Sequence, residues 1–144
     1  MLRVRDVLQA KGTDIWSIAP KATVYEVLKI MADKNIGALL VVVGEELVGI
    51  FSERDYARKV MLRGKSSRET LVEELMTREV YVVNPDDTIE KCMALMSAAY
   101  CRHLPVLEDN QLVGVLSIGD IVNAIIGEQN IKIQDLEKYI IGGY

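Results

Sequence analysis

Apolar and polar residues follow the same pattern twice along this chain, which predicts two similar folding units. A shift of 65 residues aligns residues 18–60 with residues 83–125 without a gap, and ten of the 43 aligned columns are identical. Self-similarity of this kind indicates a duplicated structural unit. The identical pairs are Pro20/Pro85, Thr23/Thr88, Met31/Met96, Leu39/Leu104, Val41/Val106, Leu47/Leu112, Val48/Val113, Gly49/Gly114, Ser52/Ser117 and Asp55/Asp120.

Each copy predicts the order helix, strand, helix, strand, strand, helix. Thr23 and Thr88 are suited to cap the second helix, because a threonine oxygen accepts a free N–H of the first turn. Two extended runs joined by a short polar turn then predict a hairpin, and the last helix begins at Ser52 or Ser117. The predicted helices and strands before that point span residues 4–10, 14–18, 24–31, 38–43 and 47–51, and again 70–76, 79–83, 89–96, 103–107 and 112–116.

The pattern divides the chain into residues 1–64, 65–127 and a helical tail at 128–144. One copy alone would bury too little surface to be stable. We therefore expect a mixed α/β (α+β) fold in which the copies pack sheet against sheet around one core, with pseudo-twofold symmetry and two equivalent clefts. In the tail, a helix over residues 128–139 has an apolar stripe at Ile133, Leu136 and Ile140 and ends at Gly142-Gly143. This stripe packs on its own domain or on a second subunit.

Composition excludes several classes of protein. The longest apolar run, residues 38–43, is too short to span a bilayer. The polar N-terminus has no signal region, so we expect a cytoplasmic protein. Two cysteines and one histidine make neither a disulfide framework nor a zinc site. Net charge is −4, but residues 1–72 hold 12 Lys and Arg against 9 Asp and Glu. The basic residues between Arg54 and Arg68 are either a solvated helix face or a positive field beside a phosphate site.

The repeated serine and aspartate are the first candidates for chemistry. Free N–H groups and the helix dipole favour an anion where a strand passes into a helix at Ser52 or Ser117. Asp55 and Asp120 lie one turn later, and a carboxylate there can accept two hydrogen bonds from a vicinal diol such as a ribose. The alternative is a plain capping pattern, which a duplication would also repeat.

A second candidate is Arg102-His103, which directly precedes an apolar strand. The matching residues of the first copy are Gly37 and Ala38, so the two clefts should differ in charge. Arginine binds phosphate bidentately, and His103 could donate a further hydrogen bond, with a purely structural histidine as the alternative. No serine or cysteine has a plausible histidine base and no glycine-rich phosphate loop is present, so we do not expect an enzyme.

Together, the duplicated Gly-x-x-Ser-x-x-Asp segments, the Arg-His-Leu-Pro-Val strand and the tandem order of elements resemble a cystathionine-β-synthase (CBS) domain pair, or Bateman module, of the stand-alone type. The resemblance covers roughly residues 3–127. It implies two intertwined β-α-β-β-α units and a disk-shaped homodimer of pairs. It also implies binding of AMP, ADP or ATP, sometimes of dinucleotides or S-adenosylmethionine, between the two copies and without a metal.

The resemblance further implies the residues of each site, with the aspartate on the ribose and the serine near the ribose or phosphate. The first site would use Ser52, Arg54, Asp55, Thr77, Val80, Tyr81, Val82, Arg102 and His103. The second would use Lys11, Gly12, Thr13, Ile15, Trp16, Gly37, Ala38, Ser117 and Asp120. Because Gly119 replaces Arg54 in the second site, phosphate affinity there depends on Lys11.

We therefore expect a sensor that binds an adenine nucleotide, AMP before ADP, ATP or NAD, and that regulates an unknown protein in trans. Two alternatives remain at this point. The first is a structural or protein-interaction module whose pockets are vestigial. The second is a nucleic-acid-binding protein that uses the basic residues between Arg54 and Arg68.

Overall fold

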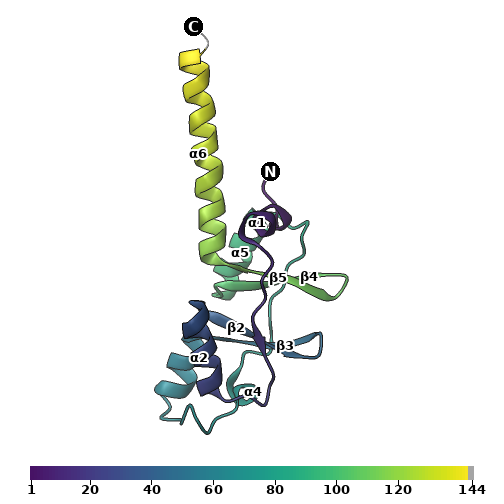
Figure 1. Cartoon of the computed structure of the whole chain (residues 1–144), viewed down its shortest axis with the longest axis vertical. Helices are drawn as coiled ribbons and strands as arrows, with labels where there is room; N and C mark the ends of the chain where they lie inside the picture. The colour runs from purple at the N-terminus through teal and green to yellow at the C-terminus, as the bar shows by residue number, and fades with distance from the viewer. Residues whose placement is uncertain (143–144) are drawn as a thin grey trace.

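Two small sheets, one from each copy, lie at the centre of the molecule and are flanked by helices (Figure 1). The computed structural model describes the backbone of residues 1–142 and the side chains of residues 1–138. In the first copy, β1 (Ser17–Ile18) runs parallel to β2 (Ala38–Val43), which is antiparallel to β3 (Glu46–Ser52). In the second copy, β4 (His103–Glu108) and β5 (Gln111–Ser117) form an antiparallel pair. The mixed α/β class is as predicted.

The two hairpins have the same register. Ala38 lies opposite Ser52 and His103 lies opposite Ser117. The register shifts once in each hairpin, between Val41 and Val42 and at the equivalent point of the second copy. The two hairpins therefore share even the irregularity in their hydrogen-bond ladders. The shared register places each predicted site serine opposite the first residue of the neighbouring strand.

The strand predicted over residues 79–83 is not formed. Only Val83 pairs with β4, through its N–H to the Pro105 carbonyl (3.1 Å) and its carbonyl to the Leu107 N–H (2.9 Å). The N–H of Val80 instead donates to the carbonyl of Arg78 (3.1 Å) in a local turn. Because of that turn, residues 79–82 do not pair with β4, and the side chain of Tyr81 is half exposed.

The second helix of each copy begins where the sequence predicts. The Thr23 hydroxyl accepts the Glu26 N–H (3.2 Å) at the start of α2 (Val24–Lys34), and Thr88 caps α5 (Ile89–Ala99) through the Lys91 N–H (3.2 Å). The apolar spacing predicts a buried face of four residues in each helix, and three of the four are buried: Leu28 is only partly buried and Met93 is 46% exposed. The buried side chains are Val24, Val27 and Met31 in α2, and Ile89, Cys92 and Met96 in α5.

The short N-terminal helix of each copy packs on the other copy. The buried residues of α1 (Val4–Lys11) join the cluster of the second copy, and those of α4 (Val72–Leu75) join the cluster of the first. The core is thus two clusters rather than the single shared core we expected, because each crossing helix completes the apolar layer of the opposite unit. The predicted intertwining of the two copies is confirmed.

One glycine in each hairpin permits this crossing. A Cβ added at Gly49 would lie 2.5 Å from Met76 Sδ, and one at Gly114 would lie 2.7 Å from Leu8 Cδ2. Only glycine leaves room for the crossing segment to approach the strand so closely. The identity of these two residues in the repeat therefore has a packing reason.

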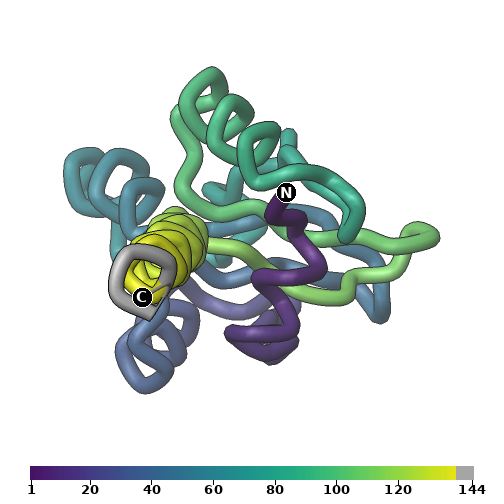
Figure 2. The backbone as a smooth tube through the Cα atoms, turned by 90° about the horizontal axis from the view of Figure 1, so that it is seen from above, coloured from purple at the N-terminus to yellow at the C-terminus, as the bar shows by residue number. Residues whose placement is uncertain are grey.

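The last helices of the two copies differ. The first is a short α3 (Glu53–Asp55) continued by a π-helical segment, η1 (Tyr56–Met61). The second, α6 (Ile118–Gly142), is one continuous helix of 25 residues that stands away from the sheets (Figures 1 and 2). We expected a separate helix over residues 128–139, but Gly127 keeps a helical conformation and does not end α6. Two parts of the prediction for the tail lie outside the described residues. They are the side chain of Ile140, which belongs to the predicted apolar stripe, and Gly143, which belongs to the predicted end of the helix.

Candidate functional site

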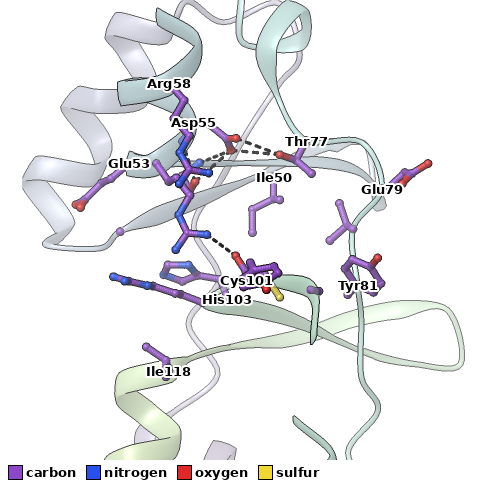
Figure 3. A pocket seen from close by; sticks show the side chains of 17 residues that line it. Ile50, Glu53, Asp55, Arg58, Thr77, Glu79, Tyr81, Cys101, His103 and Ile118 are labelled. Atoms are coloured by element: carbon purple, nitrogen blue, oxygen red, sulfur yellow. Dashed lines mark hydrogen bonds between the residues drawn. The ribbon is translucent and has the colours of Figure 1, made fainter. Parts of the chain in front are cut away.

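A cavity of about 650 Å³ opens between the two copies at the start of α3 (Figure 3). Its walls come from β3 and α3 of the first copy, from the segment after α4, and from the end of α5 and the start of β4 in the second copy. The lining residues are Gly37, Ile50, Ser52, Glu53, Arg54, Asp55, Arg58, Thr77, Glu79, Val80, Tyr81, Ala99, Tyr100, Cys101, Arg102, His103 and Ile118.

Asp55 is one of three carboxylates that line this first cavity, together with Glu53 and Glu79, and several donors fix its position. Its Oδ2 accepts the backbone N–H (3.0 Å) and the hydroxyl (3.2 Å) of Ser52, and its Oδ1 accepts the Thr77 hydroxyl (3.2 Å). Lys59 Nζ lies 3.0 Å from Oδ1. Thr77 is held in place by two backbone hydrogen bonds with Ile50 (2.8 and 3.0 Å). The Ser-x-x-Asp segment is therefore a capping box, as the alternative interpretation predicted, and it also faces a cavity. Its binding of a ribose stays a prediction.

Cationic side chains line the first cavity from two sides. Arg54, beside Asp55 in α3, donates to the backbone carbonyl of Tyr100 at the end of α5. Arg58 lies one turn further along the same helix, and Arg102 stands opposite at the start of β4. The Arg102 carbonyl accepts the first N–H of α6, from Ile118 (2.8 Å). Three guanidinium groups thus line a cavity that also holds the carboxylate of Asp55.

Four basic residues between Arg54 and Arg68 have different surroundings. Lys59 is paired with Asp55, and the Arg68 guanidinium lies 4.1 Å from the centroid of the Tyr25 ring. Arg54 and Arg58 point into the first cavity. The basic run from Arg54 to Arg68 is therefore divided between a cavity and separate surface contacts.

A second cavity of about 360 Å³ lies on the other side of the sheets, at the start of α6. Asp120 takes the place that Asp55 has in the first cavity, and its Oδ2 accepts the backbone N–H of Ser117 (2.8 Å). Lys11 Nζ lies 2.7 Å from the same oxygen. The lining residues are Lys11, Gly12, Asp14, Trp16, Asn35, Ile36, Gly37, Ala38, Leu40, Ile50, His103, Val115, Ser117 and Asp120.

The environment of Asp120 keeps it ionised. Burial alone would raise the pKa of this carboxyl, but the hydrogen bonds from Lys11 and Ser117 outweigh burial and hold the pKa below its ordinary value. Lys11 belongs to the last turn of α1. Residues 4–8 match residues 72–76 at a shift of 68 rather than 65, so the first copy has three extra residues around residues 9–13, which include Lys11. The insertion therefore gives the second cavity a cation that the repeat itself does not supply.

His103 stands between the two cavities and lines both, together with Gly37 and Ile50. Burial lowers the pKa of the imidazole, the Asp120 carboxylate opposes that effect, and Lys11 and Arg102 add to it. The ring is therefore neutral at pH 7. A Cβ added at Gly37 would lie 3.4 Å from His103 Cε1, so Gly37 leaves space for the imidazole at the shared wall.

The structure brings most of the predicted site residues to the predicted cavities. Of the first set, all except Val82 line the first cavity; Val82 faces a hollow between the two hairpin tips instead. Of the second set, Thr13 and Ile15 do not line the second cavity. The chain before β1 is extended, so neighbouring side chains alternate in direction and only Asp14 and Trp16 of that segment face the cavity.

Sequence reasoning missed several lining residues. Arg58 had a signal, because it follows Arg54 by four residues and so lies on the same helix face. Tyr100 and Cys101 had none, since only the left-handed turn at Tyr100 (φ 54°) brings the end of α5 to the cavity. Burial raises the pKa of the Cys101 thiol, which therefore stays protonated and presents a weakly polar wall.

The part of the chain that the structure describes contains no helix long and apolar enough to cross a membrane. Comparison with known proteins gives a positive result. The family model for the CBS domain matches residues 4–62 and again residues 72–127. "CBS domain-containing protein CBSX3, mitochondrial" of Arabidopsis thaliana is 40% identical, with 98% of this chain and 73% of that protein covered. "CBS domain-containing protein YhcV" of Bacillus subtilis is 32% identical, with 84% of each chain covered.

Solved structures agree with this assignment. A signal-transduction protein with CBS domains from Burkholderia ambifaria is 48% identical, with a TM-score of 0.86 over 88% of this chain and 96% of that one. The CBS domain pair of protein MJ0100, in complex with 5′-methylthioadenosine and S-adenosyl-L-methionine, is 27% identical, with a TM-score of 0.79 over 89% and 98% of the two chains. The two-fold family match, the intertwined fold and the relatives together show that this chain belongs to the CBS domain family and carries two CBS domains in tandem.

Proposed function

We propose that this protein is a regulatory sensor that binds an adenine nucleotide, AMP or ADP before ATP or NAD, between its two CBS domains. In this proposal it acts as a homodimer on another protein in trans. CBS-domain pairs are commonly regulatory modules that bind nucleotides. The observation that carries the proposal is the first cavity, which joins a fixed carboxylate, Asp55, to a wall of three arginines within a volume of about 650 Å³.

Asp55 is suited to hold a ribose. Its two oxygens already accept hydrogen bonds from Ser52 and Thr77, which fixes the plane of the carboxylate toward the cavity. A carboxylate has about four lone-pair positions, and donors from Ser52, Thr77 and Lys59 already fill them. The 2′ and 3′ hydroxyls of a ribose are therefore expected to replace some of these donors. Pre-positioned acceptors lose little conformational entropy when a ligand arrives.

The phosphate is expected against Arg54, Arg58 and Arg102. A guanidinium group matches phosphate geometry with two parallel N–H donors. Arg54 already donates to a neutral carbonyl, that of Tyr100, and a phosphate is a stronger acceptor than a carbonyl. This positive wall favours phosphorylated adenosines over S-adenosylmethionine, which carries a positive sulfonium.

The adenine ring is expected between Ile50, Val80 and Tyr81. These side chains give the first cavity an apolar wall away from the arginines. Tyr81 is half exposed and can cover a planar ring by stacking. The local turn that removes this segment from the β4 ladder thus leaves its side chains available to a ligand.

The second cavity is proposed as a weaker or differently selective site. It is smaller, at about 360 Å³. Its lining includes one lysine, Lys11, whereas the lining of the first cavity includes three arginines. A ligand at either site can shift the conformation of the protein only by its different affinity for the alternative states.

Calorimetric titration with AMP, ADP, ATP, NAD and S-adenosylmethionine tests the proposal. We expect AMP or ADP to bind most tightly and S-adenosylmethionine to bind more weakly. Absence of heat and of thermal stabilisation with all five compounds would contradict the proposal and favour an interaction module with vestigial pockets. A gel-shift assay at low salt tests the nucleic-acid alternative, because such binding is largely electrostatic.

A further inference from the structure

An exposed apolar stripe runs along α6 about a quarter turn away from the face that packs on the body of the protein. Ile121 is buried against the second CBS domain, with Ala124 and Ile125 packed beside it. The exposed apolar side chains of the stripe are Val122 (46% exposed), Ile126 (52%), Ile133 (52%) and Leu136 (62%). No other side chain buries them in the part of the chain that the structure describes. In Figure 1 the second half of α6 stands clear of both sheets.

The spacing of this stripe is that of a two-stranded coiled coil. Val122, Gln129 and Leu136 fall at the d positions of a heptad, and Ile126 and Ile133 fall at the a positions. β-branched residues at a with leucine at d favour two parallel strands. Both a positions of this stripe are isoleucine, and Leu136 is the leucine among its d positions. A 25-residue helix is about 37 Å long, enough for several turns of contact beyond the body.

We infer that α6 pairs in parallel with α6 of a second copy of this chain, and that this coiled coil is an interface of the homodimer. Charges beside the stripe support the second copy as the occupant. Lys132 falls at a g position and Glu137 at the following e position. In a parallel pair, g of one helix faces the next e of its partner, so each Lys132 meets a Glu137 of the opposite sign.

An antiparallel pair would instead bring like positions together, lysine facing lysine and glutamate facing glutamate, which is unfavourable. Within one chain, Lys132 contacts only Glu128 (3.3 Å) among the described residues. That exposed pair is weak and does not prevent Lys132 from turning to a partner. Gln129 is the polar residue of the stripe. In a parallel pair it would face Gln129 of the second helix, and the two amides could form a hydrogen bond because an amide both donates and accepts.

This inference deepens the homodimer of the proposed function but does not depend on nucleotide binding. Sedimentation equilibrium of the full chain tests the surface. Ile133→Glu/Leu136→Glu places charges in the stripe, and the dimer dissociation constant is expected to rise on the order of 100-fold, because charges are then buried without partners. The matched control is Ile131→Glu, since Ile131 is equally exposed (61%) but lies on the far side of the helix.

A monomeric wild-type protein, or a dissociation constant unchanged by the double substitution, would overturn the inference. Circular dichroism checks that the variants fold. Nucleotide titration of the same double variant separates the two proposals. If the double variant binds AMP and its dimer dissociation constant is unchanged, the α6 interface is wrong and the sensor function stands. If the double substitution weakens the dimer but none of the nucleotides binds to the wild type, the sensor function is wrong and the α6 interface stands.

Disulfide trapping tests the direction of the pair. In a parallel, in-register pair the two copies of Gln129→Cys come together and form an intermolecular disulfide on oxidation. Ile131→Cys, on the far side, is expected not to, and the wild type sets the background of Cys92 and Cys101. Crosslinking at residue 131 equal to that at residue 129, or none at 129, would overturn the parallel arrangement.

Discussion

Lys11 Nζ lies 2.7 Å from Asp120 Oδ2 and 2.7 Å from the carbonyl oxygen of Val115, so the N-terminal helix closes one side of the second cavity. In the first cavity the equivalent carboxylate, Asp55, pairs with Lys59 of its own helical segment. The equivalent carboxylates of the two cavities thus pair with lysines from different parts of the chain. Lys59 belongs to the same helical segment as Asp55, whereas Lys11 belongs to the three extra residues of the first copy.

Replacing Lys11 with methionine is expected to lower the free energy of unfolding by about 0.5–1 kcal/mol at neutral pH, because both partners are partly exposed. The pKa of Asp120 lies below 3.8 in the folded protein. The contribution of ionised Asp120 to the free energy of unfolding is therefore fully present above about pH 3.8. It is lost as the pH falls through the lower pKa that Asp120 has in the folded protein. Urea unfolding at several pH values should show the wild type and variant converging in acid.

Lys21→Met is the matched control for this measurement. Lys21 forms a pair of the same length with Glu73 (2.7 Å), but its side chain is 79% exposed. We expect it to change stability less than Lys11→Met does. A difference between wild type and Lys11→Met that stays constant far below pH 3.8 would contradict the assigned ion pair.

His103 gives the protein a second pH dependence. Burial lowers the pKa of His103, so the unfolded chain binds a proton below pH 6.5 that the folded chain does not yet bind. Stability is therefore expected to fall as the pH drops below 6.5, and His103→Gln should flatten that part of the profile. The chain has one histidine, so its ring resonance can be followed by NMR. A titration midpoint at or above 6.5 would refute the buried, neutral imidazole.

A side chain at Gly49 or Gly114 is predicted to force Met76 or Leu8 to shift. A Cβ at either position meets the crossing segment at less than 3 Å, so Gly49→Ala and Gly114→Ala should each cost about 1–3 kcal/mol through overpacking. Gly127 in α6 has no atom within 4 Å of an added Cβ. Gly127→Ala is therefore expected to be neutral or to stabilise the helix by up to about 1 kcal/mol. Equal thermal shifts for all three variants would argue against the close crossing.

Arg102 is expected to distinguish AMP from adenosine. Arg102→Gln removes one charge from the wall of the first cavity, and the preference for AMP should fall roughly tenfold if one charge-assisted contact is lost. Arg68→Gln, which removes a charge stacked on Tyr25 away from the cavity, serves as control. If the two variants change the AMP-to-adenosine ratio equally, the phosphate is not bound at Arg102.

Much of this fold could be predicted from the repeat alone. The caps at Thr23 and Thr88, both hairpins and the site serines follow from local patterns that recur, and recurrence strengthens a local signal. The crossing of α1 and α4 is not local, because Leu8 and Gly114 meet only after the chain has folded. The sequence therefore indicated two units but not which core each helix would complete.

The candidate site shows the same division. Asp55, Asp120 and Arg102 could be identified because each stands at the boundary of a predicted element. Tyr100 and Cys101 reach the first cavity through a left-handed residue that carries no glycine signal. The continuity of α6 was missed because the repeat pattern ends the second copy at residue 127 and places a separate helix after it. A single glycine at that point, Gly127, costs only about 1 kcal/mol in a long helix and does not end it.

Titration of AMP into the wild type, Asp55→Ala and Asp120→Ala tests the central claim most directly, with circular dichroism confirming that each variant folds. Loss of charge-assisted hydrogen bonds to a ribose costs about 1–3 kcal/mol, or roughly a 5- to 150-fold loss of affinity. The account predicts that Asp55→Ala loses the tight site by this factor, and that Asp120→Ala retains the tight site and affects only the weaker one. Binding of AMP to Asp55→Ala with unchanged affinity would contradict it.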